Sequence, residues 1–407
     1  MSTIPQGPLS GYRVLEMGST IAGPFCGRLF ADFGAEVIKI EPREGDGVRS
    51  AGKRYRGKSL YAASILRNKK LISVDLRHAK GQELVRRLVP QCDVVIENFR
   101  PGGLEKWGLG YADLSRLRPD LVMVRISGFG QTGPYSARPG YGIICEAASG
   151  LRHLTGDPDR PPARVAVALT DYITGLYAAF GAVMALLHRN RTGEGQYVDA
   201  ALAEGAFSFI EPHIPAFDKL GEIANRAGSG IAGSVPNNLY ATADGQFVHI
   251  QAAQNTVFRR FAPAIGRPEL PADERFINAI ARGRHQQELD DIVAEWAGKH
   301  TLADIRQALD AVDVPAMGIN NVADIFLDPH FRERGMLAEV PDDDLGAVTL
   351  TGVVPKLSRT PGHIRKSGGR VGQDTRSVLQ QLGLSAGELQ ALEAEGVVYC
   401  DSGSAAA

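Results

Sequence analysis

Residues 13–41 read RVLEMGSTIAGPFCGRLFADFGAEVIKIE, and this stretch decides the fold. A short apolar run at 13–17 leads into a glycine-rich turn, and Pro24 suits the first turn of the helix expected after it. Apolar residues then recur at helical spacing, and the chain returns to a Val/Ile-rich run at 36–41. A strand, a glycine turn, a helix and a second strand in this order are typical of the start of a parallel α/β sheet.

The alternation of strands and helices continues beyond this opening. Residues 71–75, 93–99 and 121–127 are near-continuous runs of Val, Ile and Leu, which is typical of strands covered on both faces. An amphipathic helix is predicted at 79–89, and 196–200 returns as a further strand. We therefore expect an α/β fold with a doubly wound parallel sheet that binds ligands at the carboxyl ends of its strands.

The sequence pattern changes after about residue 205. A Gly/Ser-rich stretch at 222–236 is followed by one alternating strand pattern, at 246–252, and by helical patterns at 255–265, 286–298 and 302–311. This combination predicts a second, smaller α+β domain. The expected boundaries are 1–205 for the first part of the large domain, 222–330 for the small domain, 340–400 for a return to the large domain, and 401–407 for a disordered tail.

Composition narrows the class of protein. A formal net charge of −1 gives no general attraction to nucleic acid or to an anionic membrane. The apolar stretch around 175–187 is expected to be too short to span a membrane, and the first eleven residues lack the features of a secretory signal. Four separated cysteines indicate buried thiols rather than a metal or redox pair. We expect a cytoplasmic protein with no metal site.

Asp171 lies at the expected start of a long apolar helix that ends at Gly193. One interpretation makes it a helix N-cap, whose carboxylate accepts backbone N–H groups. The other makes it a nucleophile, oriented and kept ionised by the helix N-terminus. The spacing of residues alone leaves both interpretations open.

Two further features could meet an anionic ligand. The loop at 18–23 lacks GxGxxG spacing, which disfavours a nicotinamide cofactor and leaves either a bare turn or a phosphate-binding surface. Basic residues are concentrated between 39 and 77, either as a solvated face or as a phosphate site. These are Lys39, Arg43, Arg49, Lys53, Arg54, Arg56, Lys58, Arg67, Lys69, Lys70 and Arg77.

Taken together, six ordered blocks resemble one family, the class III CoA-transferases (CaiB/BaiF, formyl-CoA transferase-like). They are IAGPFCGRLFADFGAEVIKIEPREGD, NKKLISVDLRHAKGQELVRRL, DVVIENFRPGGLEKWGLGY, ISGFGQTGPYSARPGY, the Asp171 helix and HRNRTGEGQYVDAAL. The resemblance runs from about residue 11 to 202 and continues more weakly to the C-terminus. It implies a Rossmann-like large domain, a smaller domain and an interlocked homodimer.

The resemblance also implies the roles of individual residues. Asp171 matches the catalytic aspartate of the family, and no separate cofactor is expected because the CoA thioester is itself the substrate. The positions that match coenzyme-A contacts are Ile21, Ala22, Val74, Asp75, Leu76, Arg77, Asn98, Phe99, Arg100, Lys106, Arg138 and Tyr141. This sequence departs from some members at Ile21, where they carry Gln, and at Gly142, where they carry an acidic residue. Both departures argue against formyl or oxalyl specificity.

The expected activity is transfer of CoA from an acyl-CoA donor, with succinyl-CoA as one candidate, to a carboxylic acid through Asp171. Arg152, His153, Arg160 and Arg164, in a Gly/Pro-rich loop region, would suit an acidic acceptor, although solvated side chains explain them equally well. An α-methylacyl-CoA racemase would need a histidine in the loop at 138–141, where none stands. A non-catalytic acyl-CoA-binding relative is the remaining alternative.

Overall fold

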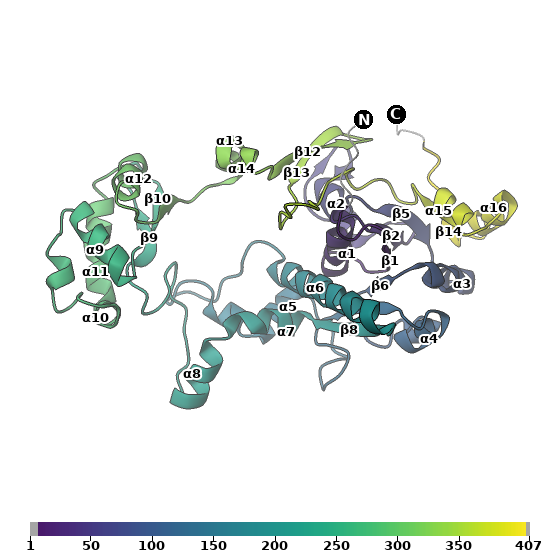
Figure 1. The fold of residues 1–407 in the computed structure, drawn as a ribbon, viewed down its shortest axis with the longest axis horizontal. Helices are drawn as coiled ribbons and strands as arrows, with labels where there is room; N and C mark the ends of the chain where they lie inside the picture. The colour runs from purple at the N-terminus through teal and green to yellow at the C-terminus, as the bar shows by residue number, and fades with distance from the viewer. Residues whose placement is uncertain (1–6, 404–407) are drawn as a thin grey trace. The chain divides into compact units, whose positions relative to one another are not determined.

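The computed structural model describes residues 7–403, and the chain divides into two units (Figure 1). The first unit combines residues 7–151, 166–214 and 330–403, so the chain leaves it twice and returns twice. The second unit combines residues 152–165 with 215–329. Every strand of the large sheet and both cavities considered below belong to the first unit.

The first unit is built on a seven-stranded sheet with the order β14-β5-β2-β1-β6-β7-β8. All neighbouring strands are parallel except β14, which pairs antiparallel with β5. The parallel strands are those predicted from the apolar runs, so the expected parallel sheet is confirmed. The strands are β1 (Arg13–Glu16), β2 (Glu36–Glu41), β5 (Lys70–Val74), β6 (Val94–Glu97), β7 (Val122–Ser127), β8 (Gln196–Ala201) and β14 (Val398–Tyr399).

The strand order places a crevice at the centre of the sheet. Leu15 of β1 lies opposite Ile38 of β2 on one side and Val95 of β6 on the other. The chain moves outward from β1 to β2 and β5, then crosses back to β6 and continues outward in the opposite direction. In sheets of this kind, ligands bind where the strand order reverses. The loops that follow β1 and β6 meet at that point.

Both faces of the sheet are covered by helices, as a doubly wound fold requires. One face packs against α1 (Ala22–Asp32) and α6 (Leu169–Thr192) through strand residues such as Val14 and Val124. The opposite face packs against α3 (Ala79–Leu88), α4 (Tyr111–Leu117), α15 (Thr375–Gln381) and α16 (Ala386–Ala394). Alternate residues of one strand thus enter different cores, because successive side chains of a strand point to opposite faces.

Helix α6 is longer than the sequence pattern indicated. It begins at Leu169 and ends at Thr192, and the next residue, Gly193, has a φ of 77°, the left-handed conformation that glycine adopts readily. By length and composition α6 is long enough to cross a membrane, so the expectation that no apolar run reaches that length was wrong. Nearly half of the residues in its most apolar 18-residue stretch are buried inside this unit. They pack against α1 and the sheet, and this packing accounts for the apolar composition of the helix.

The C-terminal part of this unit contains the two helices α15 and α16, separated by a turn containing Gly383, with φ 93°. Asp401, in the expected disordered tail, accepts a hydrogen bond from Arg370 at 2.7 Å, and residues 404–407 lie outside the described range. The other elements of this unit are β3 (Arg54–Tyr55), β4 (Lys58–Ser59), α2 (Leu60–Ile65), α5 (Gly142–Ala148), α7 (Leu202–Phe207), α14 (Pro329–Glu333, whose first residue belongs to the second unit), β12 (Leu337–Asp342), β13 (Gly346–Thr351) and short 3-10 turns.

The second unit is an α+β structure with its own core. Its antiparallel sheet has the order β11-β10-β9, and apolar side chains from the sheet and helices enclose Phe258, Phe261 and Phe276. The three predicted helices and the predicted strand are confirmed. The elements are β9 (Asn237–Ala241), β10 (Phe247–Gln251), β11 (Ala316–Gly318), α9 (Asn255–Ala264), α10 (Ala279–Arg284), α11 (Gln286–Ala297), α12 (Leu302–Asp310) and α13 (Val322–Leu327). Helix α8 (His213–Leu220) spans the boundary between the two units.

Candidate active site

A cavity of about 300 Å³ opens at the carboxyl ends of β1, β6 and β7. Asp171 of α6 lies in its wall, together with Leu202 at the start of α7. The rest of the lining comes from four segments at or beyond the strand ends, namely Ser19, Thr20 and Ala22, then residues 98–101, 126–128 and 138–141. The carboxylate predicted to carry the chemistry is therefore at the ligand-binding edge of the sheet.

The loop after β1 is held to the loop after β6 by one side chain. Asn98 accepts a hydrogen bond from the Ser19 N–H at 2.7 Å and donates one to the Ser19 carbonyl at 2.8 Å. Thr20 has a φ of 71°, an uncommon conformation for a residue with a side chain. Its N–H donates to Asp46 at 2.8 Å, which fixes this strained turn at the mouth of the cavity.

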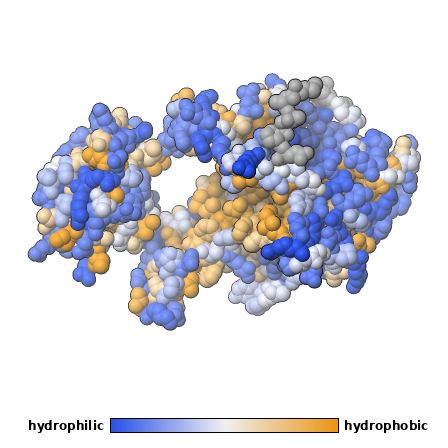
Figure 2. Space-filling model, viewed as in Figure 1, coloured by the Kyte–Doolittle hydropathy of each residue, from blue (hydrophilic) through white to orange (hydrophobic). Residues whose placement is uncertain are grey.

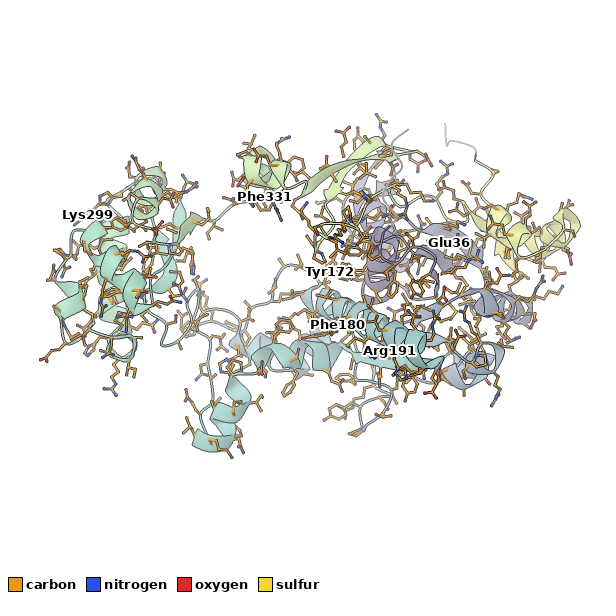
Figure 3. All side chains as sticks on the ribbon, viewed as in Figure 1. Glu36, Tyr172, Phe180, Arg191, Lys299 and Phe331 are labelled. Carbon is orange, nitrogen blue, oxygen red and sulfur yellow. The ribbon has the colours of Figure 1, made fainter. Side chains whose placement is uncertain are left out.

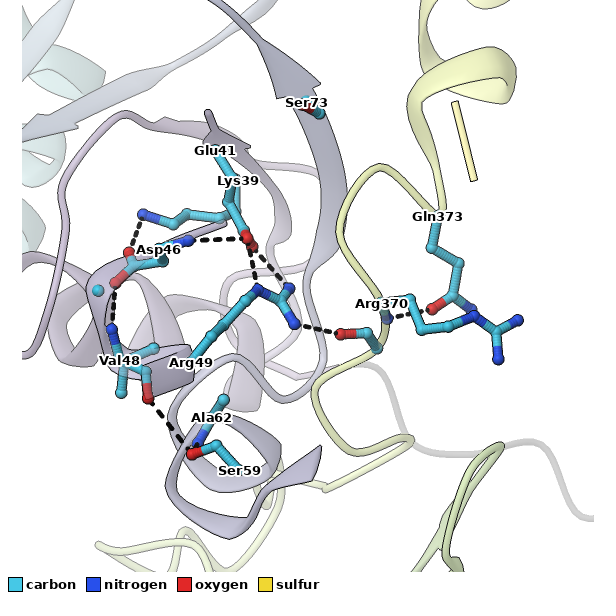
Figure 4. Close-up of polar contacts among 12 residues, drawn as sticks. Lys39, Glu41, Asp46, Val48, Arg49, Ser59, Ala62, Ser73, Arg370 and Gln373 are labelled. Carbon is cyan, nitrogen blue, oxygen red and sulfur yellow. Dashed lines mark hydrogen bonds and ion pairs between the residues drawn. The ribbon is translucent and has the colours of Figure 1, made fainter. Parts of the chain in front are cut away.

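A buried network of charges supports the same loop from below (Figure 4). The Lys39 ammonium lies 2.8 Å from Asp46 and 3.3 Å from Glu16, and it donates to the Gly18 carbonyl. Burial alone would lower the pKa of Lys39, but Asp46 and Glu16 outweigh it and the pKa is raised. Burial likewise opposes ionisation of Asp46, and Lys39 overcomes it, so the pKa of Asp46 is lowered. The pair therefore remains charged and rigid beneath the turn.

Close backbone contacts bring the remaining walls together. A Cβ at Gly140 would lie 2.8 Å from the Cα of Gly128, so the loops at 128 and 140 touch through glycines. A Cβ at Gly175 would lie 2.8 Å from the Ala22 carbonyl, so α6 lies directly against α1. Such approaches are possible only without a side chain. These glycines determine how near Asp171 comes to the loop after β1.

Asp171 is not a helix cap. Ala168 occupies the N-cap position of α6 without a side-chain hydrogen bond, and Asp171 is the third helical residue. Burial raises the pKa of its carboxyl from 3.8 to about 6, while its own backbone N–H acts in the opposite direction. Among residues 7–403 it has no ion-pair partner. It is thus an unpaired carboxylate, still ionised at neutral pH but less well solvated than an exposed aspartate.

A second cavity of about 290 Å³ lies at the carboxyl ends of β1, β2 and β5. Its lining includes Met17, Gly18, Lys39 and Trp107 together with the segment 74–77. Ser19 and Phe99 line both cavities, so the two form neighbouring parts of one edge of the sheet. An extended ligand would find a surface along this edge that ends at Asp171.

The structure gathers most of the predicted contact residues at these two cavities. The first cavity holds Ala22, Asn98, Phe99, Arg100, Arg138 and Tyr141, and the second holds Val74, Asp75, Leu76 and Arg77. Ile21 lines neither, because its side chain packs on the core around Val48 and Leu66. Lys106 also lines neither and lies exposed on a short 3-10 turn. The arginines and His153 of the loop at 152–164 belong to the second unit.

The basic residues between 39 and 77 are divided between the surface and the interior, so neither a solvated face nor a phosphate patch describes them as a whole. Three are buried (Lys39, Arg67 and Lys69), whereas Arg43, Lys53, Arg54, Arg56 and Arg77 are exposed. Arg67 is fully buried and donates to Asp32, and Lys69 lies 2.6 Å from Glu16. Arg49 lies 2.6 Å from Glu41 and also donates to the Gly369 carbonyl, which ties in the C-terminal segment (Figure 4). Sequence periodicity could not identify these pairs, because each joins residues from different elements.

Several residues that line the first cavity were not named individually by sequence reasoning. Ser19, Thr20, Ser127, Gly128 and Gly140 all line it. The first two lie in the turn predicted from its glycines, and Ser127 ends a predicted strand, so strand-end position was the available signal. The close approach of Gly128 to Gly140 carries no signal in a single sequence, because it depends on how two loops pack.

The fold and site define an α/β enzyme whose unpaired carboxylate faces the ligand-binding edge of a doubly wound sheet. The chain belongs to the CoA-transferase family III, which matches residues 9–375, and it is accordingly a class III CoA-transferase. It is 46% identical to succinyl-CoA–D-citramalate CoA-transferase of Chloroflexus aurantiacus over 97% of this chain and 99% of that protein. It is 40% identical to the beta subunit of succinyl-CoA–L-malate CoA-transferase of the same organism, over 92% of this chain and 94% of that subunit.

Solved structures give the same assignment. A CaiB/BaiF family protein from Brucella suis superposes with a TM-score of 0.82 at 34% identity, and the match covers 93% of this chain and 100% of that one. The recognition of the family from its ordered sequence blocks is therefore confirmed, and so is the expectation of an enzyme that transfers CoA.

Proposed function

We propose that Asp171 is the nucleophile of CoA transfer between succinyl-CoA and a short dicarboxylic acid. The observation that carries this proposal is an ionisable carboxylate in the cavity wall with no ion-pair partner in the described part of the chain. An aspartate held only for structure would be expected to have a partner for its charge. An attacking carboxylate must instead be unpaired, and its raised pKa of about 6 makes it a stronger base than an exposed aspartate.

Four substitutions at carbonyl carbon account for the transfer. The Asp171 carboxylate attacks the donor thioester, the C–S bond breaks, and CoA thiolate leaves behind a mixed anhydride. The thiolate attacks the aspartyl carbonyl of that anhydride, which releases the donor acid as its carboxylate and leaves an aspartyl-CoA thioester. The acceptor carboxylate attacks this thioester and expels thiolate, which then attacks the acceptor's acyl carbonyl. The products are the new acyl-CoA and the original Asp171 carboxylate, with no net consumption of protons.

We place coenzyme A along the edge that joins the two cavities. The thioester end would lie at Asp171, and the nucleotide end would lie over the segment 74–77 and Trp107. The Ser19–Thr20 turn presents backbone to the space between them, anchored by Asn98 and Asp46. The contact residues implied by the family resemblance remain our proposed binding residues, with Ile21 and Lys106 acting from outside the two linings.

The choice of acceptor is supported by the charges at the cavity. Arg100 and Arg138 line it beside Asp171, and neither has an ion pair among residues 7–403. The Arg138 guanidinium lies 3.9 Å above the ring of Tyr135, which leaves its edge available to an anion. Two arginines suit substrates with a second carboxylate, and the Chloroflexus relatives are named for succinyl-CoA with citramalate and with malate.

We also propose that the enzyme is a homodimer, interlocked as the family resemblance implies. One side of α6 presents Leu176, Phe180, Met184 and Leu187 to solvent, each about half exposed (Figures 2 and 3). This stripe belongs to the helix that carries Asp171, and an apolar strip of this kind is characteristic of an obligate interface. Light scattering of the native protein should give twice the chain mass, and Phe180→Asp should shift it toward the monomer.

The test of function uses succinyl-CoA with citramalate, malate and glutarate as acceptors, and mass spectrometry identifies the acyl-CoA formed. Asp171→Ala and Asp171→Asn should lose transfer, while exposed Asp343→Asn should keep it. Borohydride added with succinyl-CoA should reduce the acyl intermediate at Asp171 and inactivate the native enzyme. Full activity of Asp171→Ala would refute the proposal. Exchange of an α-proton of the acyl-CoA without any acceptor acid would point to a racemase. Binding of CoA with no transfer of CoA would point to a non-catalytic relative.

A further inference from the structure

The carboxylate of Asp171 lies directly against Gly142, the first residue of α5. A Cβ atom at position 142 would overlap Oδ2 of Asp171 and would lie 3.1 Å from its Cγ and 3.6 Å from Oδ1. Gly142 is buried, and its φ lies outside the left-handed region, so any residue could adopt its backbone conformation. In this chain, what opposes a side chain at 142 is therefore a lack of space. The carboxylate occupies the volume that a side chain would need.

Neither backbone is free to move away. Three residues after Gly142 in α5, the Cys145 side chain is fully buried and its Sγ lies 3.2 Å from the Gly128 carbonyl. The loop before α5 touches Gly128 through Gly140, and α6 is held against α1 at Gly175. The segments carrying Gly142 and Asp171 are thus both fixed by packing. A side chain added at 142 would be accommodated by moving the Asp171 carboxylate, the one flexible group in the contact.

We propose that Gly142 is a positioning residue for the CoA-transfer reaction, because the absence of a side chain at 142 leaves the space that the Asp171 carboxylate occupies. This inference rests on the proposed role of Asp171 as nucleophile. A methyl group at 142 would force Oδ2 to retreat by roughly 1 Å, a displacement that typically lowers the rate of a positioned reaction by about 10²-fold. The carboxylate would rotate away from α5 and toward the open cavity.

Two measurable consequences follow from such a rotation. The chemical steps slow because the attacking oxygen is misplaced, whereas the coenzyme contacts on the loops after β1 and β6 stay in place. The carboxylate also becomes better solvated, and since burial is what raises its pKa, that pKa should fall toward 3.8. A purely structural role for Gly142 would change neither the pH profile nor the balance between kcat and KM.

The experiment compares Gly142→Ala with Gly387→Ala. Gly387 lies in α16, and a Cβ there meets no atom within 4 Å, so the same chemical change is made in open space. For Gly142→Ala we expect kcat to fall by about 10²-fold with KM for succinyl-CoA changed by less than about threefold. The acid limb of kcat/KM should move to lower pH. Gly387→Ala should behave as the native enzyme in all three measurements.

Native kcat and an unmoved acid limb in Gly142→Ala would overturn the inference. If Gly142→Ala is instead unstable, thermal unfolding of the double variant with Asp171→Ala decides the question. A clash with the carboxylate alone predicts that removal of that carboxylate restores the lost stability. Persistent instability in the double variant would show that the backbone, not the nucleophile, requires glycine, and would also overturn the inference. Activity in Asp171→Ala alone would refute the proposed function separately.

Discussion

The raised pKa of Asp171 predicts that this carboxylate, our proposed nucleophile, destabilises the folded enzyme. A carboxyl whose pKa rises from 3.8 when unfolded to about 6 when folded is held ionised at an energetic disadvantage above pH 6. The corresponding loss in the free energy of unfolding is about 3 kcal/mol at pH 8. Asp171→Asn has nearly the same shape and does not titrate, so it should recover up to about 3 kcal/mol.

The sign of the pH dependence is specific. The folded state binds the proton more tightly than the unfolded chain, so the disadvantage is complete above the folded pKa of about 6. This energetic disadvantage shrinks as the pH falls from 6 toward 3.8, and it is absent once the pH is below both the folded and the unfolded pKa. The stability gained by Asp171→Asn should therefore be largest at pH 7–8 and much smaller near pH 4.5.

Urea unfolding of both proteins across this pH range, followed by circular dichroism, measures the gain directly. Asp343→Asn removes one exposed negative charge from the same unit and serves as the control, with no stabilisation expected. Equal or lower stability of Asp171→Asn at pH 8 would refute the reasoning. A gain that persists unchanged at pH 4.5 would also refute it, because it would then arise from packing rather than from ionisation.

Three further predictions concern the site and the second unit. The kcat/KM of the native enzyme should fall below pH about 6 with a slope of one, because protonation would neutralise Asp171, the proposed nucleophile. A flat profile to pH 5 would contradict this. Asn98→Ala removes both hydrogen bonds to Ser19 and should raise KM for acyl-CoA by about tenfold, measured by steady-state kinetics, whereas an unchanged KM would show that the turn holds without them. Arg282→Met should destabilise the second unit by at least about 3 kcal/mol in urea unfolding, because it leaves the Val235 and Phe276 carbonyls unpaired. The exposed Arg284→Met is its control, and equal stability of the two variants would contradict the prediction.

Much of the first unit could be predicted because its signals are local. Near-continuous apolar runs such as 71–75 and 121–127 can be strands only if both faces are covered, and the glycine turn after residue 17 directs the next helix back over the sheet. The position of Asp171 relative to the long helix was also predicted to within two residues. The interpretation of Asp171 as the helix N-cap was wrong. The residue with the N-cap backbone position is Ala168, three residues earlier in the chain.

By itself, the sequence determined the order of strands and helices, the family, and the choice of Asp171 as the candidate aspartate. Periodicity and ordered motifs can be read from neighbouring residues alone. Only the tertiary structure decided which charges are paired. Lys39 and Lys69, in the run of basic residues, are internal partners of Asp46 and Glu16. It also decided that Gly142 lies against the Asp171 carboxylate. Both are contacts between residues far apart in the chain, fixed by how helices and loops pack on the sheet.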